Sequence, residues 1–292
     1  MKSPATIASA VLIAMIIVSV ISAPEASAGK NRVEPAPTST AVAAPQGTGE
    51  AARKPAEAGA KSQGKSDGLA AIERAAKAGK YLFVFLYKDS DQQVGAARAA
   101  FDQATKKVRN RAKTGAVNIA DPAEKTFVDK LKLAGAPTPL VLVLAPNGAI
   151  TAGFQTQLDD KQVADAFVSP CTEKCLKALQ DGKLVLLCVQ NAASRSRSPA
   201  MQGVTAFKSD PRFSPMTEVI TVNPADAKEA DFLSKLQVDP KTGEAITVLM
   251  APPGGVVRKF AGATDKGVIV AAVNSLNSGG CGSGSKSGCC PK

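Results

Sequence analysis

Residues 117–133, VNIADPAEKTFVDKLKL, recur at 222–238 as VNPADAKEADFLSKLQV, and this repetition decides the fold. Eight of the seventeen aligned positions are identical. Two further pairs keep nearly the same spacing: LVLVLAPNGAI from residue 140 matches ITVLMAPPGGVV from residue 246, and GKYLFVFLY from residue 79 matches GKLVLLCV from residue 182. A fixed period of this kind indicates two copies of one structural unit.

Each copy predicts the same order of elements: helix, strand, helix, strand, helix, strand, strand and helix. In the first copy, the continuous apolar run at 81–87 predicts a strand that is covered on both faces. A helix over 67–78 is expected to precede it and to end at Gly79. Asn147-Gly148, between two apolar runs, predicts a tight hairpin.

A long second helix is expected in the first copy. Its apolar residues are spaced three and four apart between Val94 and Val108, which places them on one face. The basic stretch KKVRNRAK at 106–113 is expected to form the exposed end of this helix, because positive charge favours a helix C-terminus.

This order, with an antiparallel hairpin closing a partly parallel sheet, resembles the thioredoxin-like superfamily. The most specific element is GAPTPLVLVLAPNGAI at 135–150, which is similar to the family's segment of glycine, proline, apolar strand and turn glycine. The resemblance covers residues 67–168 directly and residues 169–277 through the repeat. It implies an α/β chain of two tandem thioredoxin-like domains, each with a central mixed sheet flanked by helices.

The resemblance also shows what is missing. In this family a Cys-x-x-Cys pair stands just after the first strand, where the helix N-terminus lowers the thiol pKa. The matching positions here are Ser90 and Gln93, and the second copy has no cysteine in the matching stretch at 189–201. The resemblance therefore implies a redox-inactive binding or structural module, and a thiol-disulfide oxidoreductase if the chain is an enzyme.

Members of this family carry a cis-proline that faces the cysteine pair on a loop that binds extended peptides. The resemblance places this residue at Pro139, with Pro137 as the alternative, whereas Ala245 stands at the corresponding place in the second copy. A surviving peptide groove and a purely architectural proline are both open. The candidate groove residues are Ser90, Gln93, Thr138 and Pro139.

The ends of the chain have a different composition. Lys2, a short apolar run and Ala26-Ser27-Ala28 are typical of a secretory signal peptide over 1–28, cleaved after Ala28. We expect a secreted or periplasmic protein with no integral membrane segment after cleavage. Residues 29–66 are expected to be a disordered linker, and residues 278–292 a flexible Gly/Ser/Cys tail.

Composition excludes several classes of function. Histidine is absent from the 292 residues, which removes Ser-His-Asp and Cys-His catalysis and His-ligated metals. Tryptophan is also absent, and only 4% of residues are aromatic, which argues against stacking platforms for nucleic acid. No phosphate-binding glycine fingerprint is present. We therefore expect no cofactor.

The six cysteines leave several interpretations open. Cys171 and Cys175 are expected on one face of a helix that begins after Ser169, too far apart to bond to each other. They would pair with the tail as a disulfide staple, bind zinc or copper(I), or exchange thiols as a redox pair. Intermolecular crosslinking is a fourth interpretation, and Cys188 is expected to be a structural residue of a strand. The candidate disulfide or thiol residues are Cys171, Cys175, Cys281, Cys289 and Cys290; the candidate metal ligands are Cys171, Cys175, Cys289 and Cys290.

The net charge of +11 predicts attraction to acidic polymers. For an exported chain these are anionic envelope components, whereas nucleic acid is disfavoured by the compartment. Arg195 and Arg197 lie where the family's active site would be and are candidate anion-binding residues, with a solvated loop as the plain alternative. A protein or peptide partner is the ligand that we expect most.

Overall fold

The computed structural model describes residues 66–89, 92–155 and 158–278, and the statements below concern these residues. The first unit follows the predicted order. Its helices and strands are α2 (Asp67–Lys77), β1 (Tyr81–Tyr87), α3 (Gln92–Thr105), β2 (Ala112–Asn118), α4 (Lys125–Lys130), β3 (Leu140–Leu144), β4 (Ile150–Phe154) and α5 (Asp160–Asp165).

The second unit repeats this order. Its helices and strands are α6 (Pro170–Gln180), β5 (Leu184–Val189), α7 (Arg197–Lys208), β6 (Thr217–Val222), α8 (Ala230–Lys235), β7 (Ile246–Ala251), β8 (Gly255–Ala261) and α9 (Lys266–Ser278). As predicted, Ser169 caps α6 by accepting a hydrogen bond from the Thr172 N–H, and Pro170 takes the first helical position.

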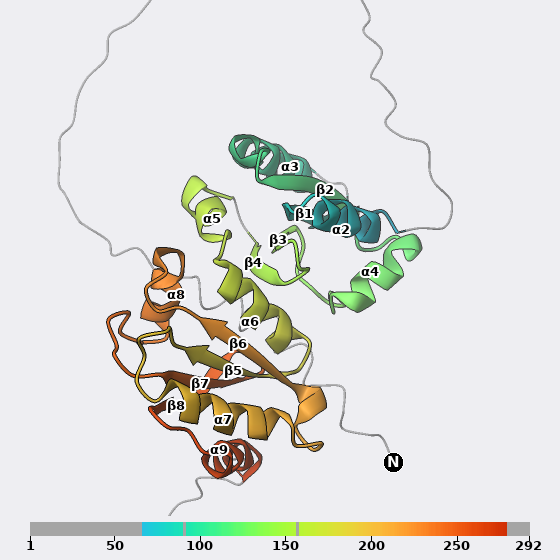
Figure 1. The fold of residues 1–292 in the computed structure, drawn as a ribbon. Helices are drawn as coiled ribbons and strands as arrows, with labels where there is room; N and C mark the ends of the chain where they lie inside the picture. The colour runs from blue at the N-terminus through green and yellow to red at the C-terminus, as the bar shows by residue number, and fades with distance from the viewer. Residues whose placement is uncertain (1–65, 90–91, 156–157, 279–292) are drawn as a thin grey trace, which may run out of the picture.

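Each unit is built on one four-stranded mixed sheet. The strand orders are β2-β1-β3-β4 and β6-β5-β7-β8. In both sheets the first pair is parallel and the other two pairs are antiparallel. Figure 1 shows the two units one above the other, with α6 between them. Among the described residues, no helix is both long and apolar enough to cross a membrane.

Helices cover both faces of the central strands, which explains why β1 is apolar throughout. Phe83 and Phe85 point into a cluster with Phe101 of α3. Leu82 and Leu86 point to the opposite face, into a separate cluster that includes residues of α2 and α4. Because successive side chains of a strand alternate between faces, each side of the sheet acquires its own hydrophobic core.

The end of α3 differs from the prediction. A short 3-10 helix covers Lys106–Val108, and β2 already begins at Ala112. The basic stretch is therefore not one helix end, and Lys113 lies in a strand. β2 is an edge strand with exposed Lys113 and Thr114, so it needs few apolar residues and has a weak sequence pattern.

Helix α6 belongs to the second unit but also contacts the first. The hydroxyl of Tyr81 in β1 donates to the Glu173 carboxylate of α6, and it accepts a hydrogen bond from the Val168 N–H at 3.2 Å. Burial is the main cause that raises the pKa of Tyr81, and its bond to Glu173 raises it further. Phe167 lies 4.7 Å from the Tyr81 ring, with the Arg111 guanidinium 4.0 Å over its face. The two units thus share one packed junction.

Gln180, at the end of α6, pairs with the edge of the first sheet. Its side-chain oxygen accepts from the Ile150 N–H at 2.8 Å, and its side-chain nitrogen donates to the Ile150 C=O at 2.7 Å. Both backbone groups of Ile150 that face away from the sheet are therefore satisfied by one side chain of the other unit.

We expect Gln180→Ala to lower the free energy of unfolding by about 1 to 3 kcal/mol, because two hydrogen bonds to β4 are lost. Hydrogen-deuterium exchange should speed up at the Ile150 amide. The control is Gln103→Ala at an exposed position of α3, which we expect to change the free energy of unfolding by less than about 0.5 kcal/mol. Equal exchange of the Ile150 amide in both variants would contradict this role of Gln180.

Candidate functional site

The position that resembles an active site lies where β1 is followed by α3. Gln93 is an exposed residue in the first turn of α3. Ser90 lies outside the described residues, so the structure does not place it. The sequence prediction that these two residues form part of one groove therefore stays a prediction.

The loop that faces this position carries a cis peptide bond between Thr138 and Pro139. This confirms Pro139, rather than Pro137, as the cis-proline. Because prolines flank Thr138, it supplies the only backbone N–H of residues 137–139. Among the described residues, neither the N–H nor the C=O of Thr138 has a hydrogen-bond partner.

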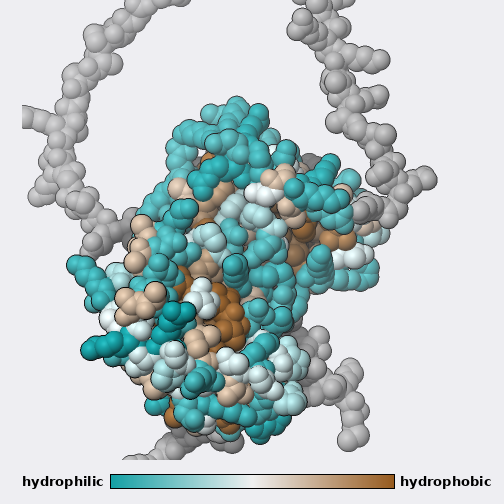
Figure 2. Space-filling model, viewed as in Figure 1, coloured by the Kyte–Doolittle hydropathy of each residue, from teal (hydrophilic) through white to brown (hydrophobic). Residues whose placement is uncertain are grey.

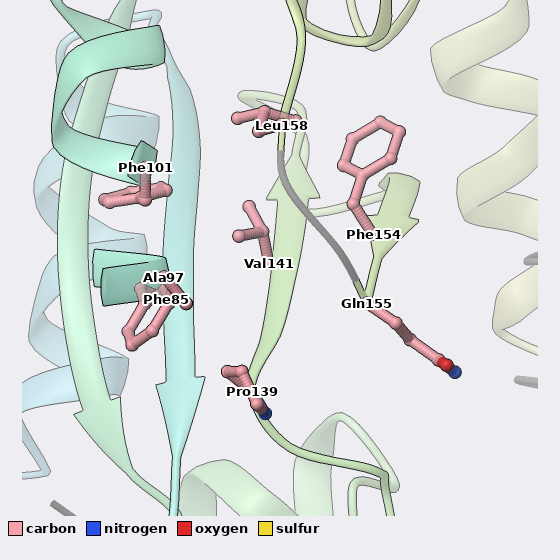
Figure 3. Close-up of a pocket in the computed structure, with 8 residues that line it drawn as sticks. All are labelled: Phe85, Ala97, Phe101, Pro139, Val141, Phe154, Gln155 and Leu158. Atoms are coloured by element: carbon pink, nitrogen blue, oxygen red, sulfur yellow. The ribbon is translucent and has the colours of Figure 1, made fainter. Parts of the chain in front are cut away.

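Beside this loop is a small apolar pocket. Figure 3 shows Phe85, Ala97 and Phe101 on one side and Val141 on the other, with Gln155 pointing away from them. The complete lining is Phe85, Ala97, Phe101, Pro139, Val141, Phe154, Gln155 and Leu158. Its volume of about 20 Å³ is near the space that one water needs. The pocket is therefore too small for a cofactor or metabolite and suits a surface contact.

The second unit closes the equivalent loop with its own chain. The Arg195 N–H donates to the Gly243 C=O at 2.8 Å, and the Ala245 N–H donates to the Arg195 C=O at 3.0 Å. The Glu244 N–H donates to the Thr242 hydroxyl at 3.3 Å. Arg195 thus pairs with the residues on either side of Glu244, whereas the N–H and C=O of Glu244, at the place of Thr138, are both hydrogen-bonded to the Thr242 hydroxyl.

The two candidate anion-binding arginines have different surroundings. The Nε atom of Arg195 lies 3.0 Å from Oε1 of Glu244, although its side chain is 76% exposed. Arg197 is the first residue of α7 and is exposed, without an acidic partner among the described residues. Glu244 already neutralises Arg195, so the anion-binding prediction depends most on Arg197.

Cys171 and Cys175 lie in the first two turns of α6 as free thiols. Their exposed fractions are only 6% and 2%. A hydrogen bond to Cys171 and burial raise the pKa of the Cys175 thiol far above its usual value, and the Glu229 carboxylate adds to this shift. Cys175 is therefore held in its thiol form at neutral pH. Nucleophilic attack and metal binding by a cysteine require the thiolate.

The other cysteines give no second site in the described part of the chain. Cys188 is a buried residue of β5, and burial raises the pKa of its thiol to about 11. Cys281, Cys289 and Cys290 lie outside the described residues, and the predicted disulfides and metal site that use them stay predictions. Residues 66–89, 92–155 and 158–278 contain no cluster of three or more cysteine or acidic side chains placed to hold a metal.

Two buried carboxylates were missed as candidate residues although the repeat aligns them. Glu124 accepts a hydrogen bond from the Asp67 N–H at 2.7 Å, at the N-terminus of α2. Glu229 accepts from the Cys171 N–H at 3.1 Å, at the N-terminus of α6. The signal was their identical place in the two copies. Both carboxylates accept hydrogen bonds from backbone N–H groups that a helix N-terminus leaves unpaired, so their role is structural.

No protein-family model matches the sequence, and no curated protein matches it. Among solved structures, the first two thioredoxin domains of Saccharomyces cerevisiae Eps1p are similar over 74% of this chain and 99% of theirs, with 9% identity and a TM-score of 0.26. Zinc-bound human ERp44 is similar over 73% of this chain and 60% of its own, with 11% identity and a TM-score of 0.31. The NTD_N/C domain of alkylhydroperoxide reductase AhpF from Enterococcus faecalis is similar over 70% of this chain and 98% of its own, with 13% identity and a TM-score of 0.24.

The fold assignment depends on the topology of this chain itself. Both sheets have a parallel pair followed by two antiparallel pairs, with helices on both faces. The first unit also has the cis-proline directly before β3. The predicted fold is confirmed: the chain has two tandem thioredoxin-like folds.

Proposed function

We propose that this chain is an exported, redox-inactive thioredoxin-like binding protein whose first unit holds an extended peptide segment of a partner beside Thr138 and Pro139. The observation that carries the proposal is the difference between the two equivalent loops. In the second unit, the N–H and C=O of Glu244 at the equivalent place are both hydrogen-bonded to the Thr242 hydroxyl. The first unit leaves the backbone of Thr138 without a partner among the described residues.

The chemistry of the thiols supports a binding role. Neither unit has a Cys-x-x-Cys pair, and the three described cysteines are buried. Export is supported by the sequence pattern of residues 1–28. The net charge of +11 supports an additional attraction to anionic envelope surfaces, which rising salt should weaken.

We expect Ala97→Glu to weaken peptide binding to the first unit by about ten-fold or more. Ala97 is half-buried in the lining beside Pro139, so a carboxylate there places an uncompensated charge against an apolar contact. The probe is a heptapeptide enriched from a random display library on the wild-type protein, measured by fluorescence polarisation. Ala99→Glu, at an exposed position on the same helix, is the matched control and should change affinity less than two-fold.

Circular dichroism must show that both variants are folded. Enrichment of no peptide, or equal binding by the Ala97→Glu and Ala99→Glu proteins, would refute the groove in the first unit. Reaction of the described thiols with a disulfide reagent in the native protein would refute the redox-inactive assignment.

A further inference from the structure

A second surface, in the other unit, has an unpaired strand edge. β6 pairs only with β5, so its other side is free of strands. The Gln190 N–H donates to the Val222 C=O at 3.0 Å, which shows that the backbone of Val222 faces β5. Because backbone groups alternate along a strand, Val219 and Thr221 face outward. Lys208 confirms this alternation, since its ammonium binds the outward C=O of Thr217.

The outward groups of Val219 and Thr221 have no hydrogen-bond partner in the described part of the chain. Two residues with free N–H and C=O groups give an added strand four hydrogen bonds. Strand addition at such an edge is a common way to bind extended peptides.

This edge borders a groove of about 420 Å³ that the tandem arrangement creates. Asn147, in the hairpin turn of the first unit, donates its side-chain N–H to the Glu173 C=O of α6 at 2.9 Å and forms part of the wall. Figure 2 shows a small hydrophobic patch within a mostly hydrophilic face, in the region where β6 lies in Figure 1. The lining residues are Asn147, Lys174, Lys177, Ala178, Asp181, Lys183, Glu218, Val219, Ile220 and Thr221.

The charges of the groove favour an acidic occupant. Lys177 pairs with Asp181, and Lys183 lies 3.4 Å from Glu218. Lys174 is exposed and has no acidic partner among the described residues. Both groove carboxylates are therefore already neutralised, and one ammonium group remains for a carboxylate of the ligand.

We propose that the β6 edge binds an acidic, extended segment of a partner protein as an added strand, with its backbone on Val219 and Thr221 and a carboxylate on Lys174. This site is separate from the loop at Thr138 and does not depend on it. Glu218 and Ile220 line the groove beside α6, so alternate residues of the ligand face the lysines. A segment that alternates acidic and β-branched residues fits this arrangement.

The probe is a fluorescein-labelled hexapeptide of alternating Glu and Val, titrated by fluorescence polarisation. We expect Thr221→Pro to weaken binding by about ten-fold or more. Proline removes the outward N–H of an exposed edge residue and leaves the pairing with β5 intact. The matched control is Ala116→Pro, at the equivalent outward position of β2, which should change affinity less than two-fold.

Two further measurements separate strand addition from general attraction to a basic protein. Lys174→Glu should weaken binding by about ten-fold or more. Lys161→Glu makes the same charge change at an exposed position of α5 and should not weaken binding. A hexapeptide N-methylated on alternate residues, which cannot pair its backbone, should bind at least about ten-fold more weakly. These two tests also decide the question if the Thr221→Pro protein does not fold.

The proposal is overturned if the wild-type protein does not bind the Glu-Val peptide. It is overturned equally if the N-methylated peptide, or a hexapeptide of alternating Lys and Val, binds as well as the Glu-Val peptide. It is also overturned if Lys174→Glu and Lys161→Glu have the same effect. Ala97→Glu should leave this binding unchanged, so failure of the β6 site and failure of the groove in the first unit are distinguishable.

Discussion

Gly203→Ala is expected to destabilise the second unit by at least about 3 kcal/mol. A Cβ atom on Gly203, in the middle of α7, would lie 1.7 Å from the backbone oxygen of Thr264. Backbone atoms of Thr264 and Asp265 lie directly against this position, just before α9 begins. The added methyl group can be accommodated only if α9 moves away from α7, which opens the core between them.

Gly95→Ala is the matched control. Gly95 also lies in a helix, α3, but its Cβ would meet nothing within 4 Å. Alanine is the better helix former, so this variant should be more stable than wild type by about 0.5 to 1 kcal/mol. The same substitution therefore has opposite signs at two helical glycines.

Urea unfolding followed by two signals tests the prediction. Both tyrosines of the chain, Tyr81 and Tyr87, lie in β1, and tryptophan is absent. Tyrosine fluorescence therefore reports the first unit together with its junction with α6 at Tyr81, while far-ultraviolet circular dichroism reports both units. For Gly203→Ala the dichroism transition should move to lower urea by more than the fluorescence transition. Equal midpoints for Gly203→Ala and wild type would show that α9 accommodates the methyl group without cost.

Most of the fold could be predicted from local patterns. The repeat at 117–133 and 222–238 gave the number of units and the order of elements, because each unit has to bury the same faces. Asn147-Gly148 marked the hairpin, and Gly148 has a φ of 81° that suits glycine. Pro139 was found through the resemblance to the thioredoxin-like superfamily, which places a cis-proline before this strand. These signals lie within a few residues of the elements that they specify.

The surfaces depend on contacts between distant residues and could not be predicted in this way. The pairing of Arg195 with residues 243–245 closes the loop of the second unit across about fifty residues of chain. The groove at β6 needs Asn147 of the first unit beside α6 of the second. β2 was partly missed because an edge strand with exposed Lys113 lacks continuous apolar character. The pattern of apolar residues in a sequence predicts which face of each helix or strand is buried. It does not predict which exposed backbone groups and surfaces distant residues cover.

The buried carboxylates should have the second large effect. We expect Glu229→Ala to destabilise the second unit by about 2 to 4 kcal/mol. Glu229 is 4% exposed and accepts hydrogen bonds from the Ser169 hydroxyl and the Cys171 N–H at the start of α6. Alanine leaves the buried Cys171 N–H without its acceptor, takes one partner from the half-buried Ser169 hydroxyl, and removes a negative charge from the positive end of the helix dipole.

The repeat supplies the matched experiment in the first unit. Glu124 has the same place there and accepts from the Ser66 hydroxyl and from the Asp67 N–H. Glu124→Ala should therefore shift the tyrosine fluorescence transition to lower urea. Glu229→Ala should shift the dichroism transition by more than the fluorescence transition, which it reaches only through the contact of α6 with Tyr81. Glutamine at either position keeps a side-chain oxygen acceptor and should recover part of the loss. If glutamine and alanine are equally destabilising, the negative charge at the helix N-terminus, rather than the acceptor geometry, stabilises both helices.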